Sequence, residues 1–257
     1  MKKLIKIFVI FVLLLVSLIL WSFTETKFLK VNEYNVINKT LPDSFNGLKI
    51  VHFGDILYGS SVDTHYLNNV VKEINKYKPD VVVFTGDLYS KDIKLTKKNK
   101  KEITKSLSKI NCSLFKYAIW GDNDKEEYEQ IMKEAGFIIL KDNYDELYYE
   151  GTTPIIISNT DTDKDLYTVR LIHKPDEIDD INKDNVNLVL AGHSLNGQIR
   201  VPFYGALIKR SGAKKYTDMD YKYDNYEIHI TNGLGTNAPY LRFSNIPSIN
   251  LYRLTNY

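Results

Sequence analysis

Three strand patterns alternate with three helical patterns between residues 48 and 135, and this alternation limits the fold more than any other feature. The strand patterns are GLKIVHFG, PDVVVFTGD and FKYAIWGD, and the helical patterns cover residues 62–77, 98–110 and 125–135. The strands are mostly apolar along their length, as expected for parallel strands that are buried on both faces. The first half of the chain therefore predicts a parallel sheet built from βαβ units.

From Phe137 onward the sequence changes to short, β-rich segments that are separated by turns. Examples are TPIIISN, DLYTVRLIH, NVNLVLAG and YEIHITNG, with PDEIDDIN as the main segment of helical spacing. The chain has 257 residues, of which 44% are hydrophobic and 26% charged, so it can bury one substantial core. The two halves together predict one α/β domain in which two sheets pack against each other and helices lie outside.

A run from Ile7 to Trp21 that is apolar except for Ser17 follows three lysines, Lys2, Lys3 and Lys6, and continues through Ser22 to Phe23. This length is near the lower limit for a helix that crosses a bilayer. A cleaved signal peptide is the rival interpretation, but no small-x-small cleavage site follows the run. We therefore expect an uncleaved signal anchor that makes the protein single-pass in the cell membrane. Because the lysines precede the run, the soluble domain is expected on the extracytoplasmic side.

The expected division of the chain is a transmembrane signal anchor at 1–23, a linker and first strand at 24–47, and the folded domain at 48–257. A net charge of +2, from 34 basic and 32 acidic residues, gives no electrostatic footprint for nucleic acid, so no nucleic-acid partner is expected. Cys112 is the only cysteine, which excludes an intramolecular disulfide and a thiolate zinc site. The lysine-rich stretch 94–109 has the spacing of a solvated helix face, with contact to anionic lipid head groups as the alternative.

Polar side chains stand where five of the predicted strands end. Glycine precedes four of them and allows the sharp turn that aims the side chain away from the strand. Strand ends of this kind gather at one edge of a sheet, where ligand sites of α/β folds form. The sequence therefore predicts one shared site for these five residues: Asp55, Asp87, Asp122, His173 and His193. The other histidines, His52, His65 and His229, lie outside such motifs and are expected in packing or surface positions.

The order of these motifs resembles that of the calcineurin-like metallophosphoesterases, and within them the membrane-anchored bacterial branch. The family's string is Asp-x-His, Gly-Asp, Gly-Asn-His-(Asp/Glu), His and Gly-His-x-His. Here it reads GDILYG, TGDLYS, WGDND, LIHKP and AGHSLNGQIRVP, and NGLGTNAPYLRFSNIP is similar to the closing segment of that branch. The resemblance extends from Val31 to the C-terminus. It implies a four-layer α/β/β/α sandwich, here preceded by one N-terminal transmembrane helix.

The resemblance also implies ligands for two metal ions, and the chain departs from the family at the first. The positions of the first ion read Asp55, Leu57, Asp87 and Leu195, so two imidazoles are replaced by leucines. The positions of the second ion read Asp87, Asp122, His173 and His193, and all four can bind a divalent cation. We therefore expect one ion, manganese, iron or zinc. The family's catalytic histidine corresponds to Asn123.

The implied activity is metal-dependent hydrolysis of a phosphomonoester, phosphodiester or pyrophosphate bond, with Asp87 and Asn123 at the catalytic positions. Two ions about 3.5–4 Å apart hold both the attacking and the leaving oxygen, so the loss of one predicts weak activity. The alternative is a catalytically inactive pseudoenzyme that binds metal or phosphate at the cell surface. The expected partners are a phosphorylated small molecule or a lipid-linked phosphate, and the membrane through the N-terminal helix.

Overall fold

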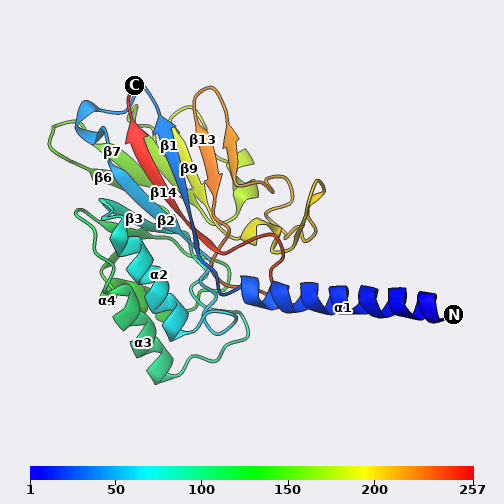
Figure 1. Cartoon of the computed structure of the whole chain (residues 1–257). Helices are drawn as coiled ribbons and strands as arrows, with labels where there is room; N and C mark the ends of the chain where they lie inside the picture. The colour runs from blue at the N-terminus through cyan, green and yellow to red at the C-terminus, as the bar shows by residue number, and fades with distance from the viewer.

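A computed structural model describes all 257 residues and shows one long helix that projects from a folded body (Figure 1). This helix, α1 (Lys2–Glu25), contains an 18-residue window with a mean hydropathy of 3.0, and none of that window is buried against the rest of the chain. By length and composition α1 can cross a membrane, as the apolar run predicts.

The first half of the chain builds a six-stranded sheet in which most neighbouring strands are parallel. Only β14 and β2 pair antiparallel, so the last strand of the chain closes the sheet between two early ones. The order across this first sheet is β1 (Lys30–Ile37), β14 (Ser248–Thr255), β2 (Lys49–Phe53), β3 (Val81–Phe84), β4 (Lys116–Ala118) and β5 (Phe137–Ile139).

The second half builds another six-stranded sheet, whose central strands are parallel and whose two edge strands are antiparallel. Its order is β12 (Asp220–Lys222), β13 (Glu227–Ile230), β9 (Leu188–Ala191), β8 (Thr168–Ile172), β7 (Ile155–Ser158) and β6 (Tyr144–Leu147). A separate two-stranded hairpin consists of β10 (Arg200–Val201) and β11 (Gly205–Ala206).

The strands of the first sheet are buried on both faces, which explains their nearly continuous apolar sequences. Alternate residues point to opposite faces of a strand. On β2, Val51 and Phe53 therefore belong to a core beneath the helices, and Ile50 belongs to a second core between the two sheets. The helices that cover the first core are α2 (Thr64–Lys76), α3 (Lys97–Leu107) and α4 (Glu127–Glu134), which lie together over one face of the sheet (Figure 1).

The predicted α/β class and two-sheet sandwich are confirmed, and the fourth layer is thinner than the family pattern implies. The outer face of the second sheet is covered by loops and one 3₁₀ helix, η2 (Pro175–Asp179), which is the form that the PDEIDDIN segment takes. Two further 3₁₀ helices are η1 (Asp43–Phe45) and η3 (Leu195–Gly197). Each predicted α-helix of the first half is present and shorter than its sequence pattern, although α3 begins one residue before the predicted start.

The end of α1 is fixed to the folded body by its last turn. Glu25 is buried, and its carboxylate accepts hydrogen bonds from the backbone N–H groups of Ser244, at 3.0 Å, and Asn245. The carbonyl of Ser22 accepts a further bond from the N–H of Arg242, at 3.0 Å. Arg242 is itself fully buried and donates to the carbonyls of Asn232, Gly233, Gly235 and Asn245. The helix therefore meets the domain without a flexible spacer.

Replacing Glu25 by alanine should destabilise the domain, because the buried N–H group of Asn245 and the N–H group of Ser244 lose a charged acceptor. Hydrogen bonds to charged groups contribute about 1.5–3 kcal/mol, so we expect the free energy of unfolding of the detergent-solubilised full chain to fall by about 3 kcal/mol. Chemical denaturation measures this change. Glu33→Ala, which removes an exposed carboxylate from β1, is the matched control and should change stability by less than about 0.5 kcal/mol. Equal effects of the two substitutions would contradict the docking role of Glu25.

Candidate metal centre

The five strand-end residues lie at the edge where the two sheets meet. Because parallel strands present their carboxyl ends at one edge, residues far apart in the sequence reach a common region. The first sheet contributes Asp55 after β2, Asp87 after β3 and Asp122 after β4, and the second contributes His173 after β8 and His193 after β9. Three of them form a compact cluster: one ligand atom each of Asp87, His173 and His193 lies within 4.8 Å of the others.

Backbone carbonyls orient both imidazoles of this cluster. His173 Nδ1 lies 2.7 Å from the carbonyl of Thr85, and His193 Nε2 lies 2.8 Å from the carbonyl of Ser211. A carbonyl can only accept, so each of these ring nitrogens is an N–H donor. The second nitrogen of each neutral ring, His173 Nε2 and His193 Nδ1, then carries a lone pair, and these two atoms lie 3.2 Å apart.

The arrangement fits a divalent cation. Two nitrogen lone pairs at this separation repel unless a proton or a cation lies between them, and carbonyl bonds to the outer nitrogens are the usual support of metal-bound histidines. Metal–nitrogen bonds of about 2.0–2.1 Å at a tetrahedral angle give a nitrogen–nitrogen distance of about 3.4 Å, close to the one observed. An oxygen of Asp87 lies 3.6 Å from His173 Nε2, a position from which it can supply an anionic ligand.

The charges in the cluster favour a cation in the same place. Burial alone would lower the pKa of His173, but the carboxylates of Asp87 and Asp55 raise it to about 9. Burial and the neighbouring His173 both lower the pKa of His193. Burial would raise the pKa of Asp87, yet His173 and the N–H of Asn123 hold it below its ordinary value. Without an ion the cluster therefore keeps one proton on His173, at the position that a metal would take.

Asp55 lies beside the cluster in a different setting. It is fully buried, both of its oxygens accept from the backbone N–H of His193, at 3.0 and 2.9 Å, and burial raises its pKa to about 7. Burial lowers the pKa of Arg210, and the negative charges of Asp55 and Asp87 offset part of this lowering. On this side of the site the carboxylates therefore face a guanidinium group.

The two leucines at the first-ion positions keep the backbone of a ligand loop. Leu57 has a φ of 45° and Leu195 a φ of 49°, and Asp55, Asp87 and His193 also have positive φ values, of 49°, 60° and 63°. This left-handed conformation is rare for a bulky residue and unfavourable by roughly 1–2 kcal/mol. Both leucine side chains are fully buried and lie against Gly235 and Gly233, where a Cβ atom would collide with them. Apolar contacts therefore occupy the space where two imidazoles would point.

Asp122 lies at the rim of the site and not in the compact cluster. One of its oxygens is 4.0 Å from His193 Nδ1, and the other forms an ion pair of 2.6 Å with Lys174. The side chain is 47% exposed, so it can turn toward a cation without breaking a buried contact.

Asn123, at the position of the family's catalytic histidine, is bonded to Asp87. Its backbone N–H donates to one oxygen of Asp87, at 2.8 Å, and its side-chain amide donates to the other, at 2.7 Å. Asp124 holds the two loops together, because it accepts from the N–H groups of Asp87, Leu88 and Gly121 at 2.8–2.9 Å. Together these contacts fix the orientation of the Asp87 carboxylate.

Three residues near the site escaped the sequence interpretation: Lys174, Asp124 and Arg210. Lys174 directly follows His173, and Asp124 completes the GDND motif, so their places beside predicted site residues could have indicated that they lie near the site. Arg210 stands in a loop without a motif, and nothing local marks it. The remaining histidines lie outside the cluster, as expected: His65 is exposed, His52 is bonded to Tyr252 and Thr85 between the sheets, and His229 is bonded to Glu227.

The model of the calcineurin-like phosphoesterase family matches residues 48–198, which is more than half of the chain and includes all five strand-end residues. The chain belongs to this family. The uncharacterized metallophosphoesterase YkuE of Bacillus subtilis is 29% identical to it over 253 residues, which cover 90% of this chain and 87% of that protein. An uncharacterized metallophosphoesterase of Aquifex aeolicus is 26% identical over 258 residues, covering 89% and 93%. The phosphodiesterase YaeI of Escherichia coli is 22% identical over 212 residues, covering 76% and 77%.

Metal binding by this phosphoesterase should release about one proton at pH 7, because His173, with a pKa of about 9, must lose its proton to become a ligand. The apparent affinity for Mn²⁺ should accordingly rise with pH up to about 9 and fall by about tenfold for each unit below it. Titration calorimetry in two buffers of different ionisation enthalpy measures the proton count. His65→Ala, at an exposed histidine, is the control and should leave the count unchanged. Identical heats in the two buffers would show that no proton is displaced.

Proposed function

We propose that this chain is a metal-dependent phosphoesterase that works with one divalent ion, manganese, iron or zinc, and therefore hydrolyses slowly. The observation that carries the proposal is the pair of inward-facing imidazole nitrogens of His173 and His193, 3.2 Å apart beside Asp87, in a chain of the phosphoesterase family. The buried leucines at positions 57 and 195 support a single ion, because neither offers a ligand atom.

The ligands proposed for the ion are Asp87, His173 and His193, completed by Asp122 from the rim; Asp55 is the remaining carboxylate of the former first-ion site. When bound, a divalent ion there polarises a phosphoryl oxygen and acidifies water. Lys174 and Arg210 supply further positive charge for a phosphate. Lys174 is bonded to Asp122, so movement of Asp122 toward a cation would release the ammonium group toward the open side of the site.

The proposed rate limit lies at Asn123. An amide can donate a hydrogen bond to a phosphate oxygen, but it does not give up a proton to a leaving group as an imidazolium does. Its side chain is also engaged by Asp87, at 2.7 Å. Substrate cleavage would therefore lack both the first of the family's two ions and the general acid, which supports a weak phosphomonoesterase, phosphodiesterase or pyrophosphatase.

The second candidate is a pseudoenzyme that binds metal or phosphate at the cell surface without turnover. The same three departures, at Leu57, Leu195 and Asn123, favour it, since the metal ligands are kept while the groups needed for fast chemistry are not. For either candidate the partner is a phosphorylated small molecule or a lipid-linked phosphate. The name of the Escherichia coli relative, a phosphodiesterase, favours a diester as the first substrate to test.

We further propose that residues 1–23 anchor the protein as a single span in the cell membrane, with the linker and first strand at 24–47 and the phosphoesterase domain at 48–257. The apolar surface of α1 and the lysines at its start support this arrangement, which places the domain on the extracytoplasmic side.

Restoring the family's residues at three positions tests whether the chain is a slow enzyme or a pseudoenzyme. Leu57→His and Leu195→His should raise the metal content from one ion per chain to two, because the left-handed loops already aim these positions at the site. Adding Asn123→His returns a general acid, typically worth about 10²–10⁴-fold. Elemental analysis and the Mn²⁺-dependent cleavage of an aryl phosphodiester or monoester measure the two changes. The activity of the double variant measures the effect of the second ion per chain, and the further change in the triple variant measures the effect of the general acid.

Asp87→Asn is the inactive control for this experiment. A slow enzyme should cleave the aryl ester measurably above that control before any restoration. A native protein that binds one ion yet shows no turnover above the control would be the pseudoenzyme. Two ions in the unmodified protein, or a rate equal to that of two-metal relatives, would refute the one-ion site.

The proposed membrane orientation has a direct test. Protease added to intact cells should digest the domain while a cytoplasmic marker protein survives, because the lysines of α1 are held on the inner side. Digestion after cell lysis is the control that shows the domain to be cleavable. Full protection in intact cells would reverse the orientation.

A further inference from the structure

The hairpin segment 200–207, formed by β10, its turn and β11, exposes large apolar side chains at its tip. Phe203 is fully exposed and Tyr204 is 75% exposed, and Val201 and Leu207 flank them with 37% and 52% of their surface exposed. Single exposed apolar residues are common on soluble proteins, but an aromatic pair at the tip of a projecting turn marks an interaction site. This hairpin has no part in the metal cluster.

The hairpin is joined to the membrane end of α1 through one short segment, residues 242–245. The N–H of Arg200 donates to the carbonyl of Phe243, at 2.9 Å. The neighbouring residue Ser244 donates to Glu25 at the end of α1, and a groove of about 420 Å³ lies between the hairpin and Ser244. The hairpin and the helix end therefore occupy one surface of the domain.

That surface must lie close to the bilayer when α1 crosses it. A hydrocarbon core of about 30 Å needs about 20 helical residues, so α1, with 24 residues, needs nearly all of its length up to Phe23. Ser22 and Glu25 are already buried in the domain. No spacer can hold the domain away from the lipid head groups, and the ring pair of Trp21 and Phe28, with centroids 5.9 Å apart, gives the aromatic anchor typical of this boundary.

Figure 1 shows the yellow loops around residue 200 on the side of the domain from which α1 projects. The charge of this region matches a membrane surface with anionic lipids. Residues 199–215 contain no acidic residue. Basic residues near such a surface are attracted to it by about 1 kcal/mol each. The basic residues of this stretch that are exposed and not paired with an acidic side chain are Lys209 and Lys214, because Arg200 pairs with Asp218, Lys215 pairs with Asp179, and Arg210 lies near Asp55 and Asp87.

We propose that the hairpin segment 200–207 is a second membrane contact, with Phe203 and Tyr204 inserted in the head-group region of the bilayer that α1 spans. The proposal rests on the membrane anchoring by α1 proposed above. The exposed ring of Tyr204 suits this depth, because its body is apolar and its hydroxyl remains hydrated. Ser211, a few residues after the hairpin, accepts from His193, so this contact would also hold the metal cluster near the membrane surface.

A depth-sensitive fluorophore on the full-length chain tests the contact. With Cys112→Ser as the background, Phe203→Cys is labelled with an NBD dye and the protein is reconstituted in phosphatidylcholine–phosphatidylglycerol vesicles with and without doxyl-labelled lipid. The emission should shift to the blue, and the quencher should reduce its intensity by about twofold or more, as for a side chain in the interface. Tyr204→Cys repeats the measurement at the neighbouring position.

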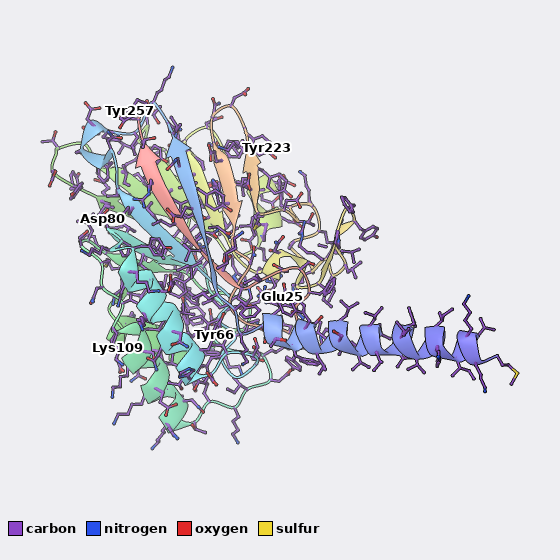
Figure 2. The ribbon with its side chains drawn as sticks, viewed as in Figure 1. Glu25, Tyr66, Asp80, Lys109, Tyr223 and Tyr257 are labelled. Carbon is purple, nitrogen blue, oxygen red and sulfur yellow. The ribbon has the colours of Figure 1, made fainter.

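Tyr257→Cys is the matched control, because Tyr257 is 82% exposed and lies at the end of the domain away from Glu25 (Figure 2). Its dye should show neither the blue shift nor the quenching. Flotation of the vesicles separates the two proposals. Protein that floats while dyes at 203 and 204 behave like the dye at 257 would overturn the hairpin contact and leave the anchor intact. Protein that fails to float would overturn both.

Discussion

The hydrogen bonds from the N–H of His193 to both oxygens of Asp55 hold together the two sheets on which the whole site depends. Asp55 ends a strand of the first sheet and His193 ends a strand of the second, so this contact sets the distance between their carboxyl edges. The imidazole of His193 is thereby placed beside His173 and Asp87. A carboxylate that is fully buried with a raised pKa is tolerated there because a backbone donor and the charge of Arg210 compensate it.

Local sequence patterns were sufficient for most helices and strands, and the assignment of chemistry to the residues that follow the strands stays a prediction. Apolar strands that end in Gly-Asp or Gly-His predicted which side chains would share an edge, and the family model supports the same region. Patterns could not show that the amide of Asn123 would bond Asp87, nor that Lys174 would pair with Asp122. Such contacts depend on the final distance between loops, which no local period encodes. Arg210 was missed for the same reason, and the thin fourth layer because a short 3₁₀ helix has little periodicity.

The metal cluster and the hairpin segment proposed to contact the membrane are parts of one continuous stretch of chain. Residue 193 carries an imidazole, the hairpin follows within a few residues, and the chain then returns to Ser211, whose carbonyl orients that imidazole. Asn245, whose N–H binds Glu25, donates its side-chain amide to the carbonyls of Leu195 and Asn196. The end of α1 and the loop of the site are therefore linked by a few hydrogen bonds through a rigid segment. The proposed anchor and the metal cluster therefore share one hydrogen-bonded framework.

The left-handed backbone at Leu57 and Leu195 has an evolutionary consequence. The conformation is unfavourable for leucine, and a leucine side chain has no atom that can bind a metal ion. The loops therefore have the backbone of a ligand loop without the side chains that would use it. Return to a two-ion site would need substitutions at these positions but no rebuilding of the loops, and two of the six leucine codons are one base away from a histidine codon. The proposed loss of a first ion would therefore be reversible by few mutations.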